Sequence, residues 1–446
     1  MDQLTIGILG FVVFLALGLL RVPIAYAMSI VGLSGMLIVY PIDAAFKFIP
    51  TGMFTYTSNF TLAALPLFIL MGTLAYYADL GKDAYVAAKA WFGRVPGGLG
   101  VATVYSSAIF GACSGSSLSS VAVFSKIAVP EMIRANYSKK LALGVVASSA
   151  CLDVLIPPSI LMVFFGIITE TSVGQLLIAG IVPGIVTAVF MATGVMLYCT
   201  IHPEAAPTDN NLDTSWKAKL STLKNLWAAA ALFVSVLGAI YTGFATPDEA
   251  AAVGVVGALL LVYIRGNLTW EIVKYSFIDS AKVSAMIFLL LGSGYIFSTF
   301  LSTTGVVSSM TDWIKNLNLS FYVLMAGIVV LYLFLGCFLD AVSMMVLTMP
   351  ILAPLMLDYN MSLVWFGVVV VVMMSIGTIT PPLGLNCFVM KGALGDGYEL
   401  SDIFAGCLPF VVLMLCTVAL FIAFPQISLW LPELMKSMRW THPNNL

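Results

Sequence analysis

The residues of this chain that could do chemistry are hydroxyls, glycines and a few carboxylates that lie inside apolar stretches. Serines crowd positions 114–120, Asp340 interrupts a second apolar stretch, and Gly377, Thr378 and Thr380 end a third. Neutral oxygens together with a carboxylate are ligands that suit a hard cation. An ionisable residue inside a membrane span is by default a candidate functional residue. The pattern therefore predicts an ion-binding site within a membrane.

Other kinds of site have little to be built from. The chain has only two histidines, His202 and His442, and its seven cysteines form no C-x-x-C pair. A haem, a zinc site or a Ser-His-Asp triad therefore lacks residues, and we expect no cofactor. No P-loop pattern of G-x-x-x-x-G-K followed by Ser or Thr occurs, so no ATP site is expected. A net charge of −2 gives nucleic-acid binding no support.

Composition places the candidate residues in a multi-pass membrane protein. Of the 446 residues, 61% are hydrophobic and 9% are charged, against about 45–50% and about 25% in soluble domains. The mean hydropathy is +1.05. At about 20 residues per span, the chain can hold roughly a dozen crossings. We therefore predict an all-α polytopic membrane protein and not a soluble enzyme.

Four of the apolar stretches are interrupted, and the candidate residues lie in or beside the interruptions. They comprise two predicted re-entrant hairpins, at about 98–130 and 321–357, and two predicted discontinuous helices, at about 142–170 and 364–390. Pro157-Pro158 and Pro381-Pro382 break the discontinuous helices; these prolines free carbonyls but bind nothing themselves. A helix broken at mid-depth exposes N–H groups that suit an anion and carbonyls that suit a small cation.

A shift of 224 residues aligns the two halves of the chain. It brings Pro23 onto Pro247, Pro130 onto Pro354, the two double prolines onto each other, and Cys113 onto Cys337. The two halves, 1–201 and 225–446, flank a polar connecting loop at 202–224. Interrupted helices at corresponding positions of two halves are the best sequence indication of a secondary transporter's binding site. Hydropathy does not decide between a parallel and an inverted repeat; we expect an inverted one.

At these segments the chain resembles the large membrane subunit of TRAP transporters, the tripartite ATP-independent periplasmic systems. The resemblance covers essentially the whole chain and rests on residues 110–117 leading to Val129-Pro130-Glu131-Met132, and on residues 155–159, 245–252, 338–340 and 376–386. It implies an elevator-type, Na⁺-driven importer of an organic anion, such as a carboxylate, in a bacterial inner membrane. It also implies two partners, a small four-helix membrane subunit and a periplasmic substrate-binding protein.

The resemblance and the repeat together assign two sets of residues to a substrate and cation site. The first half contributes Ser114, Gly115, Ser116, Ser117, Ser148, Ser149, Cys151 and Asp153. The second half contributes Gly336, Asp340, Gly377, Thr378, Thr380, Gly384 and Asn386. Na⁺ is the only metal ion expected at these positions.

Two of these assignments have a structural alternative. The serine cluster at 114–120 could be plain helix packing, since small residues let membrane helices approach closely. Asp340 could cap backbone N–H groups at a hairpin end near the surface.

Lys126 and Asp153 depart from the family's pattern, which has small residues at these places. Two unpaired charges at membrane depth would each cost roughly 2.5–3.5 kcal/mol. We therefore consider that Lys126 and Asp153 interact and modify or replace the first cation site. The alternative is that Lys126 extends to the membrane interface while Asp153 alone adds a carboxylate to a cation site.

Three rival functions remain open on the sequence. The nearest is a stand-alone anion–cation symporter that needs no binding protein. An intramembrane aspartyl enzyme would pair Asp153 with Asp340, although neither residue lies in a Gly-x-Gly-Asp setting. A passive channel is the third. The positive-inside rule places the Arg134–Lys140 connection in the cytoplasm.

Overall fold

We analysed a computed structural model of the chain, which describes residues 2–20, 22–43, 50, 53–54, 58, 60–207 and 215–440. Helices connected by short turns make up nearly all of this part of the chain, which contains no strand. The all-α expectation is therefore confirmed. Residues 208–214 of the expected connecting loop lie outside the described residues.

The helices of the first half precede the connecting loop. They are α1 (Gln3–Leu19), α2 (Ile24–Val39), η1 (Phe60–Ala63), α4 (Ala64–Tyr77), α5 (Leu80–Phe92), α6 (Gly98–Ser114), α7 (Ser117–Arg134), α8 (Lys139–Ser149), η2 (Ala150–Val154), α9 (Ile160–Ile168), α10 (Val173–Ala179) and α11 (Ile181–Ile201).

The loop and the second half contain the remaining elements. They are η3 (Pro203–Ala205), α12 (Trp216–Leu223), η4 (Lys224–Leu226), α13 (Trp227–Thr242), α14 (Pro247–Ile264), α15 (Trp270–Thr303), α16 (Val306–Asn316), α17 (Phe321–Gly336), α18 (Ala341–Asp358), α19 (Leu363–Gly377), α20 (Leu385–Leu394), α21 (Leu400–Ala423) and α22 (Gln426–Trp440).

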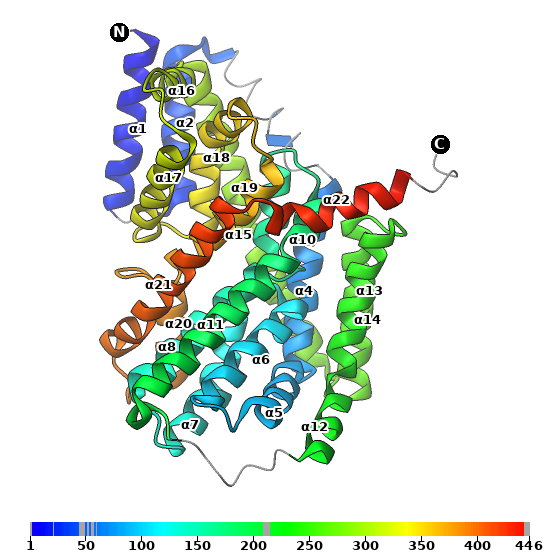
Figure 1. Cartoon of the computed structure of the whole chain (residues 1–446). Helices are drawn as coiled ribbons and strands as arrows, with labels where there is room; N and C mark the ends of the chain where they lie inside the picture. Colours follow the sequence, from blue (N-terminus) through cyan, green and yellow to red (C-terminus); the bar gives the residue numbers. More distant parts are fainter. Residues whose placement is uncertain are drawn as a thin grey trace.

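Helix boundaries in the two halves follow each other at the offset of 224 residues. Helices α7 and α18 begin and end 224 positions apart, and the starts of α1 and α13 and of α8 and α19 differ by the same number. In Figure 1, α1 runs downward from the N-terminus, whereas α13 begins beside α12 at the lower end and runs upward. Helices at corresponding positions thus run in opposite directions.

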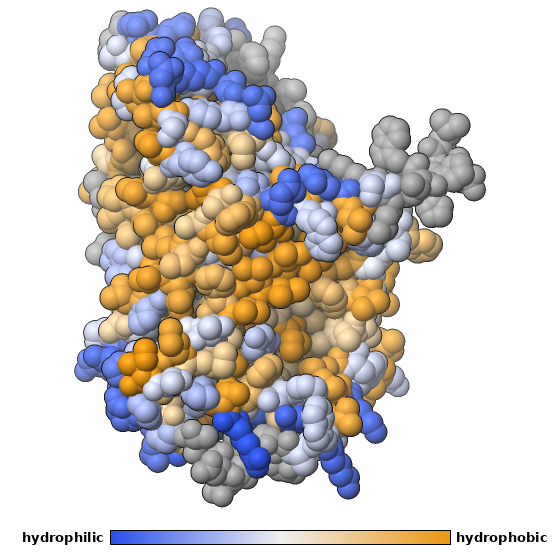
Figure 2. All heavy atoms as spheres, viewed as in Figure 1, coloured by the Kyte–Doolittle hydropathy of each residue, from blue (hydrophilic) through white to orange (hydrophobic). Residues whose placement is uncertain are grey.

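An apolar belt surrounds the middle of the molecule. Figure 2 shows orange, hydrophobic atoms across the centre and blue, hydrophilic atoms toward the two ends. Within the described residues, seven helical stretches are long and apolar enough to cross a membrane. They are Phe60–Tyr77, Val173–Ile201, Trp216–Thr242, Pro247–Ile264, Trp270–Thr303, Ala341–Asp358 and Leu400–Ala423. Length, composition and the belt identify a multi-pass membrane protein.

Helix α19 occupies the centre of the second half because its sequence is apolar on every side. Its residues from Val364 to Gly377 are all buried, as expected for a helix without a polar face. The indole N–H of Trp365 donates a 2.8 Å hydrogen bond to the carbonyl oxygen of Phe421 on α21. This packing fixes the end of α19, where Gly377 and Thr378 stand.

Candidate functional site

The first hairpin consists of α6 and α7, which meet at a tight break. Gly115 has a φ of +62°, a left-handed conformation that favours glycine. A β-carbon at Gly115 would lie 2.3 Å from the carbonyl oxygen of Pro158, inside the gap between η2 and α9. The hairpin tip therefore packs directly against the double proline of the broken helix, whose Pro157–Pro158 peptide is cis.

Asp153 lies at the centre of this contact, enclosed by serine hydroxyls of the hairpin. The Ser107 hydroxyl donates to Oδ1 at 3.2 Å, and the Ser114 hydroxyl donates to Oδ2 at 3.3 Å. The Ser120 hydroxyl also donates to Oδ2. Asp153, Ser107 and Ser120 have no exposed surface, and Ser114 is 1% exposed. The hairpin thus supplies polar partners for a carboxylate that is shielded from solvent.

The structure does not bring Lys126 and Asp153 together, which corrects the proposed charge pair. Lys126 is exposed on α7 and lines a separate cavity, whereas Asp153 is fully buried. Ser120, which does reach Asp153, is six residues before Lys126; on a helix that is about 240° around the axis and about 9 Å along it. Lys126 consequently points away from the carboxylate, as in the alternative where it extends toward the surface.

The other candidates of the first half divide between the hairpin tip and the contact between the two broken helices. Ser116 is the N-cap residue of α7, and Ser117 begins that helix. The Cys151 thiol donates to the carbonyl oxygen of Ser375 at 3.3 Å. The hydroxyl of Ser149 bonds within its own helix, and the buried hydroxyl of Ser148 has no hydrogen-bond partner among the described residues.

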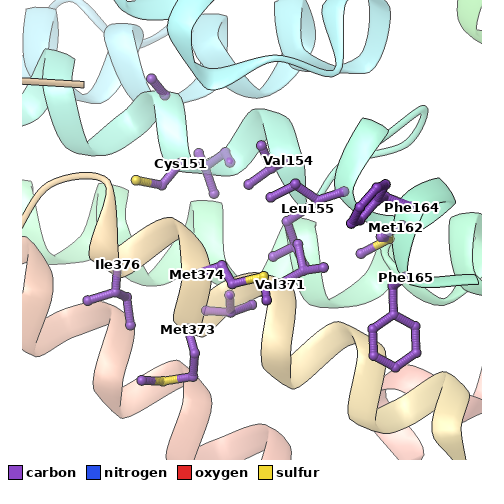
Figure 3. Packing of buried hydrophobic residues seen from close by; sticks show 14 of the residues in the cluster. Cys151, Val154, Leu155, Met162, Phe164, Phe165, Val371, Met373, Met374 and Ile376 are labelled. Carbon is purple, nitrogen blue, oxygen red and sulfur yellow. The ribbon is translucent and has the colours of Figure 1, made fainter. Parts of the chain in front are cut away.

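The broken helices of the two halves pack against each other. Figure 3 shows Cys151, Val154 and Leu155 facing Met374 and Ile376 of α19. The amide nitrogen of Asn386 donates to the carbonyl oxygen of Ala147 at 3.3 Å. The breaks predicted in separate halves thus form one central contact.

The second hairpin and broken helix line an open pocket of about 570 Å³. Five of the seven candidates of the second half line it: Gly336, Asp340, Gly377, Thr378 and Gly384. The other two lie outside the lining. The Thr380 hydroxyl donates to the carbonyl of Ile376 at 2.6 Å, and Asn386 joins the central contact.

Asp340 both caps a helix and lines the pocket. It is the N-cap residue of α18, and its Oδ2 accepts the backbone N–H of Val342 at 3.1 Å and that of Ser343 at 3.2 Å. The Ser343 hydroxyl donates to the other oxygen. The capping alternative therefore describes the geometry, and it is compatible with a site because the half-buried carboxylate stays in the pocket wall.

The two candidate carboxylates are not partners. Asp153 is enclosed by serines of α6 and α7, whereas Asp340 caps α18 beside the open pocket. The paired carboxylates of an aspartyl enzyme are thus not formed.

Two glycines allow the second hairpin to touch the broken helix. A β-carbon on Gly336 would lie 2.8 Å from the α-carbon of Gly377. Contacts that short with backbone atoms require the chain to shift, so both positions need a hydrogen in place of a side chain. The pocket is therefore bounded by bare backbone, which leaves peptide groups available beside Asp340.

Sequence reasoning missed three hydroxyls: Ser107, Ser120 and Ser343. Ser120 belongs to the serine cluster at 114–120, but its distance from the hairpin tip gave no reason to choose it. Ser343 follows Asp340 by three residues, the spacing of a cap interaction, and could have been found from that signal. Ser107 had no signal, because its partner Asp153 is 46 residues away.

Comparison with known proteins assigns the chain to a family. The model of the "Tripartite ATP-independent periplasmic transporter, DctM component" family matches residues 11–427. The C4-dicarboxylate TRAP transporter large permease protein DctM of Pseudomonas aeruginosa is 31% identical over 85% of this chain and 88% of the relative. The sialic acid TRAP transporter large permease protein SiaM of Vibrio cholerae is 29% identical over 94% and 97%.

Two further comparisons concern chain length and fold. The isethionate TRAP transporter permease protein DctMQ of Oleidesulfovibrio alaskensis is 30% identical over 94% of this chain, which matches only 65% of that longer relative. The solved structure of the Alcanivorax borkumensis YdaH transporter superposes with a TM-score of 0.63 at 12% identity, covering 95% of this chain and 99% of that one. These relatives are transporters and permeases, not enzymes. The chain belongs to the DctM family of tripartite ATP-independent periplasmic transporters.

Proposed function

We propose that this chain imports an organic anion, most simply a carboxylate, together with Na⁺. The observation that carries the proposal is the 570 Å³ pocket, in which Asp340 stands beside the bare backbone of Gly336 and Gly377. The names of the relatives above support the substrate class, since C4-dicarboxylates, sialic acid and isethionate are all organic acids.

The charge of Asp340 supports a cation as the second passenger. A carboxylate in the wall of a pocket repels an anionic substrate unless a positive charge lies between them. Peptide carbonyls, the hydroxyl of Thr378 and a carboxylate are oxygen ligands for a hard cation. We place one Na⁺ site in this pocket and the other at Asp153, where three serine hydroxyls surround the carboxylate.

We further propose that the two halves are inverted repeats that move as an elevator. The offset of 224 residues between helix boundaries and the opposite directions of α1 and α13 in Figure 1 support the repeat. The likeness to the YdaH transporter supports the fold alone. In this arrangement the hairpins and broken helices would form the moving part, because they hold both candidate sites.

We infer that the chain works in a bacterial inner membrane with a small four-helix subunit and a periplasmic binding protein. Family membership supports both partners. The DctMQ relative, with about a third of its length unmatched by this chain, supports a separate small subunit here. A requirement for the binding protein would also exclude a stand-alone symporter and a passive channel.

The test is uptake into proteoliposomes that contain the chain with its co-expressed small subunit and the purified binding protein. We expect uptake to require an inward Na⁺ gradient. In Asp340→Asn, the Na⁺ concentration for half-maximal uptake should rise by at least about tenfold, because a charge close to a cation contributes several kcal/mol. The matched control is Asp396→Asn, which changes an exposed carboxylate on the loop between α20 and α21.

Two outcomes would contradict this proposal. Equal uptake with a proton gradient in the absence of Na⁺ would remove Na⁺ as the coupling ion. An Asp340→Asn variant with the Na⁺ dependence of Asp396→Asn would leave Asp340 as a helix cap only.

A further inference from the structure

A second polar cavity lies away from both carboxylate sites. It has a volume of about 700 Å³ and opens between the end of α4, the start of α5, the middle of α7 and the segment leading into α15. Its polar lining comprises Tyr76, Tyr77, Asp79, Lys82, Lys126 and Asn267, with Thr269 at the start of α15. Neither the hairpin tips nor the double prolines reach it.

Two lysines from different helices share the wall of this cavity. A β-carbon on Gly81 of α5 would lie 2.8 Å from a methyl group of Val123 on α7, so the two helices touch there. Lys82 is the next residue after Gly81, and Lys126 follows Val123 by one helical turn. The contact thus places both exposed ammonium groups at the same opening, where their like charges repel each other.

The nearby carboxylates do not neutralise this pair. Asp83 binds Arg265, and Glu131 binds Lys89. Asp79, the single carboxylate in the lining, accepts a hydrogen bond from the side-chain nitrogen of Asn267 at 3.3 Å. Among the described residues, Lys82 and Lys126 have no ion-pair partner. Two lysines against one aspartate leave the cavity with a net positive charge.

We propose that Lys82 and Lys126 form a binding site for an oxyanion, a carboxylate or a phosphate group. An anion between the ammonium groups relieves their repulsion and receives hydrogen bonds from both, and charge-assisted hydrogen bonds of this kind are the strong ones. The N-terminus of α15, whose Thr269 lines the cavity, adds a favourable field for negative charge. The tyrosines give the rest of the ligand an amphipathic wall.

The position of the cavity suggests two sources of the oxyanion. Lys126 lies on α7 between Ser120, which contacts Asp153, and the Arg134–Lys140 connection. A transported anion that leaves the first hairpin on that side would meet this site. The headgroup of an anionic lipid at the membrane surface presents the same chemistry.

The test is acylation of lysines with a water-soluble amine-reactive ester on the full chain in phosphatidylcholine nanodiscs, quantified by mass spectrometry. Succinate or inorganic phosphate is added, with chloride at matched ionic strength as the reference. At about ten times the dissociation constant, mass action leaves about a tenth of the sites empty, so labelling of Lys82 and Lys126 should fall about tenfold. Lys217 and Lys224, exposed before α13, are the internal controls.

A second arm identifies the source. Nanodiscs with phosphatidylglycerol and no added succinate should protect both lysines if a lipid headgroup is the ligand, and should leave them reactive if the soluble anion is. In Lys82→Gln, protection of Lys126 should weaken, while labelling of Lys217 stays unchanged and shows that the chain is intact. Labelling of Lys82 and Lys126 that follows Lys217 under every condition would overturn the site. Because the assay needs neither a Na⁺ gradient nor a binding protein, its result is independent of the transport proposal.

Discussion

The two halves of the chain each place one carboxylate at the contact between hairpin and broken helix, but on opposite sides of it. In the second half Asp340 caps the hairpin helix α18, and the broken helix offers Gly377. In the first half the hairpin residue 224 positions before Asp340 is Ser116, and the broken-helix residue 224 before Gly377 is Asp153. The acidic group has moved from one partner to the other.

This difference changes what each site can do. The carboxylate of Asp340 is half-buried, is held by backbone N–H groups and borders an open pocket. Asp153 has no exposed surface and is held by side-chain hydroxyls. One arrangement leaves room for a ligand and the other fills its own space. The comparison teaches that a shared backbone frame can hold a carboxylate at either of two positions with different access.

The largest effect is expected from removing the buried carboxylate. In Asp153→Gly, each serine hydroxyl that finds no other acceptor costs about 1–3 kcal/mol. We expect a clear loss of thermal stability together with reduced uptake. Adding Ser116→Asp should recover much of the uptake, because Ser119 would then lie three residues after the new carboxylate, as Ser343 does after Asp340. Unchanged uptake in the double variant relative to Asp153→Gly would show that the two positions are not interchangeable.

A smaller effect is expected at the close approach in the second half. In Gly336→Ala the new methyl group would stand 2.8 Å from the α-carbon of Gly377, so the hairpin must shift. Overpacking of this kind costs about 1–3 kcal/mol, measured as a fall in melting temperature and in uptake. The control is Gly392→Ala on α20, where a β-carbon meets no atom within 4 Å. Equal behaviour of the two variants would argue against a tight contact.

The smallest effect is expected from coupling between Lys126 and Asp153. Because the structure separates them, the losses caused by Lys126→Ala and Asp153→Gly should add within about 0.3–0.5 kcal/mol in a double-mutant cycle on thermal stability. A double variant that recovers what either single change loses would restore the charge pair and refute the placement of Lys126 at the second cavity.

The sequence by itself determined the class of the protein, the interrupted helices and the residues at the second pocket. Each of these is local: apolar length defines a span, proline breaks a helix, and Asp340 with Ser343 forms a cap within three residues. The family motifs are equally local, which is why five of the seven second-half candidates line one pocket.

Only the tertiary structure decided the partners of the charged residues in the first half. Asp153 faces Ser107, Ser114 and Ser120 because α6 and α7 fold back over η2, and Lys126 turns the other way on the same helix. Their pairing looked favourable from the energetic cost of two isolated charges in a membrane. That argument fixes that each charge needs a polar environment, but not which one, since the choice depends on the rotation of α7 against segments more than twenty residues away in the sequence.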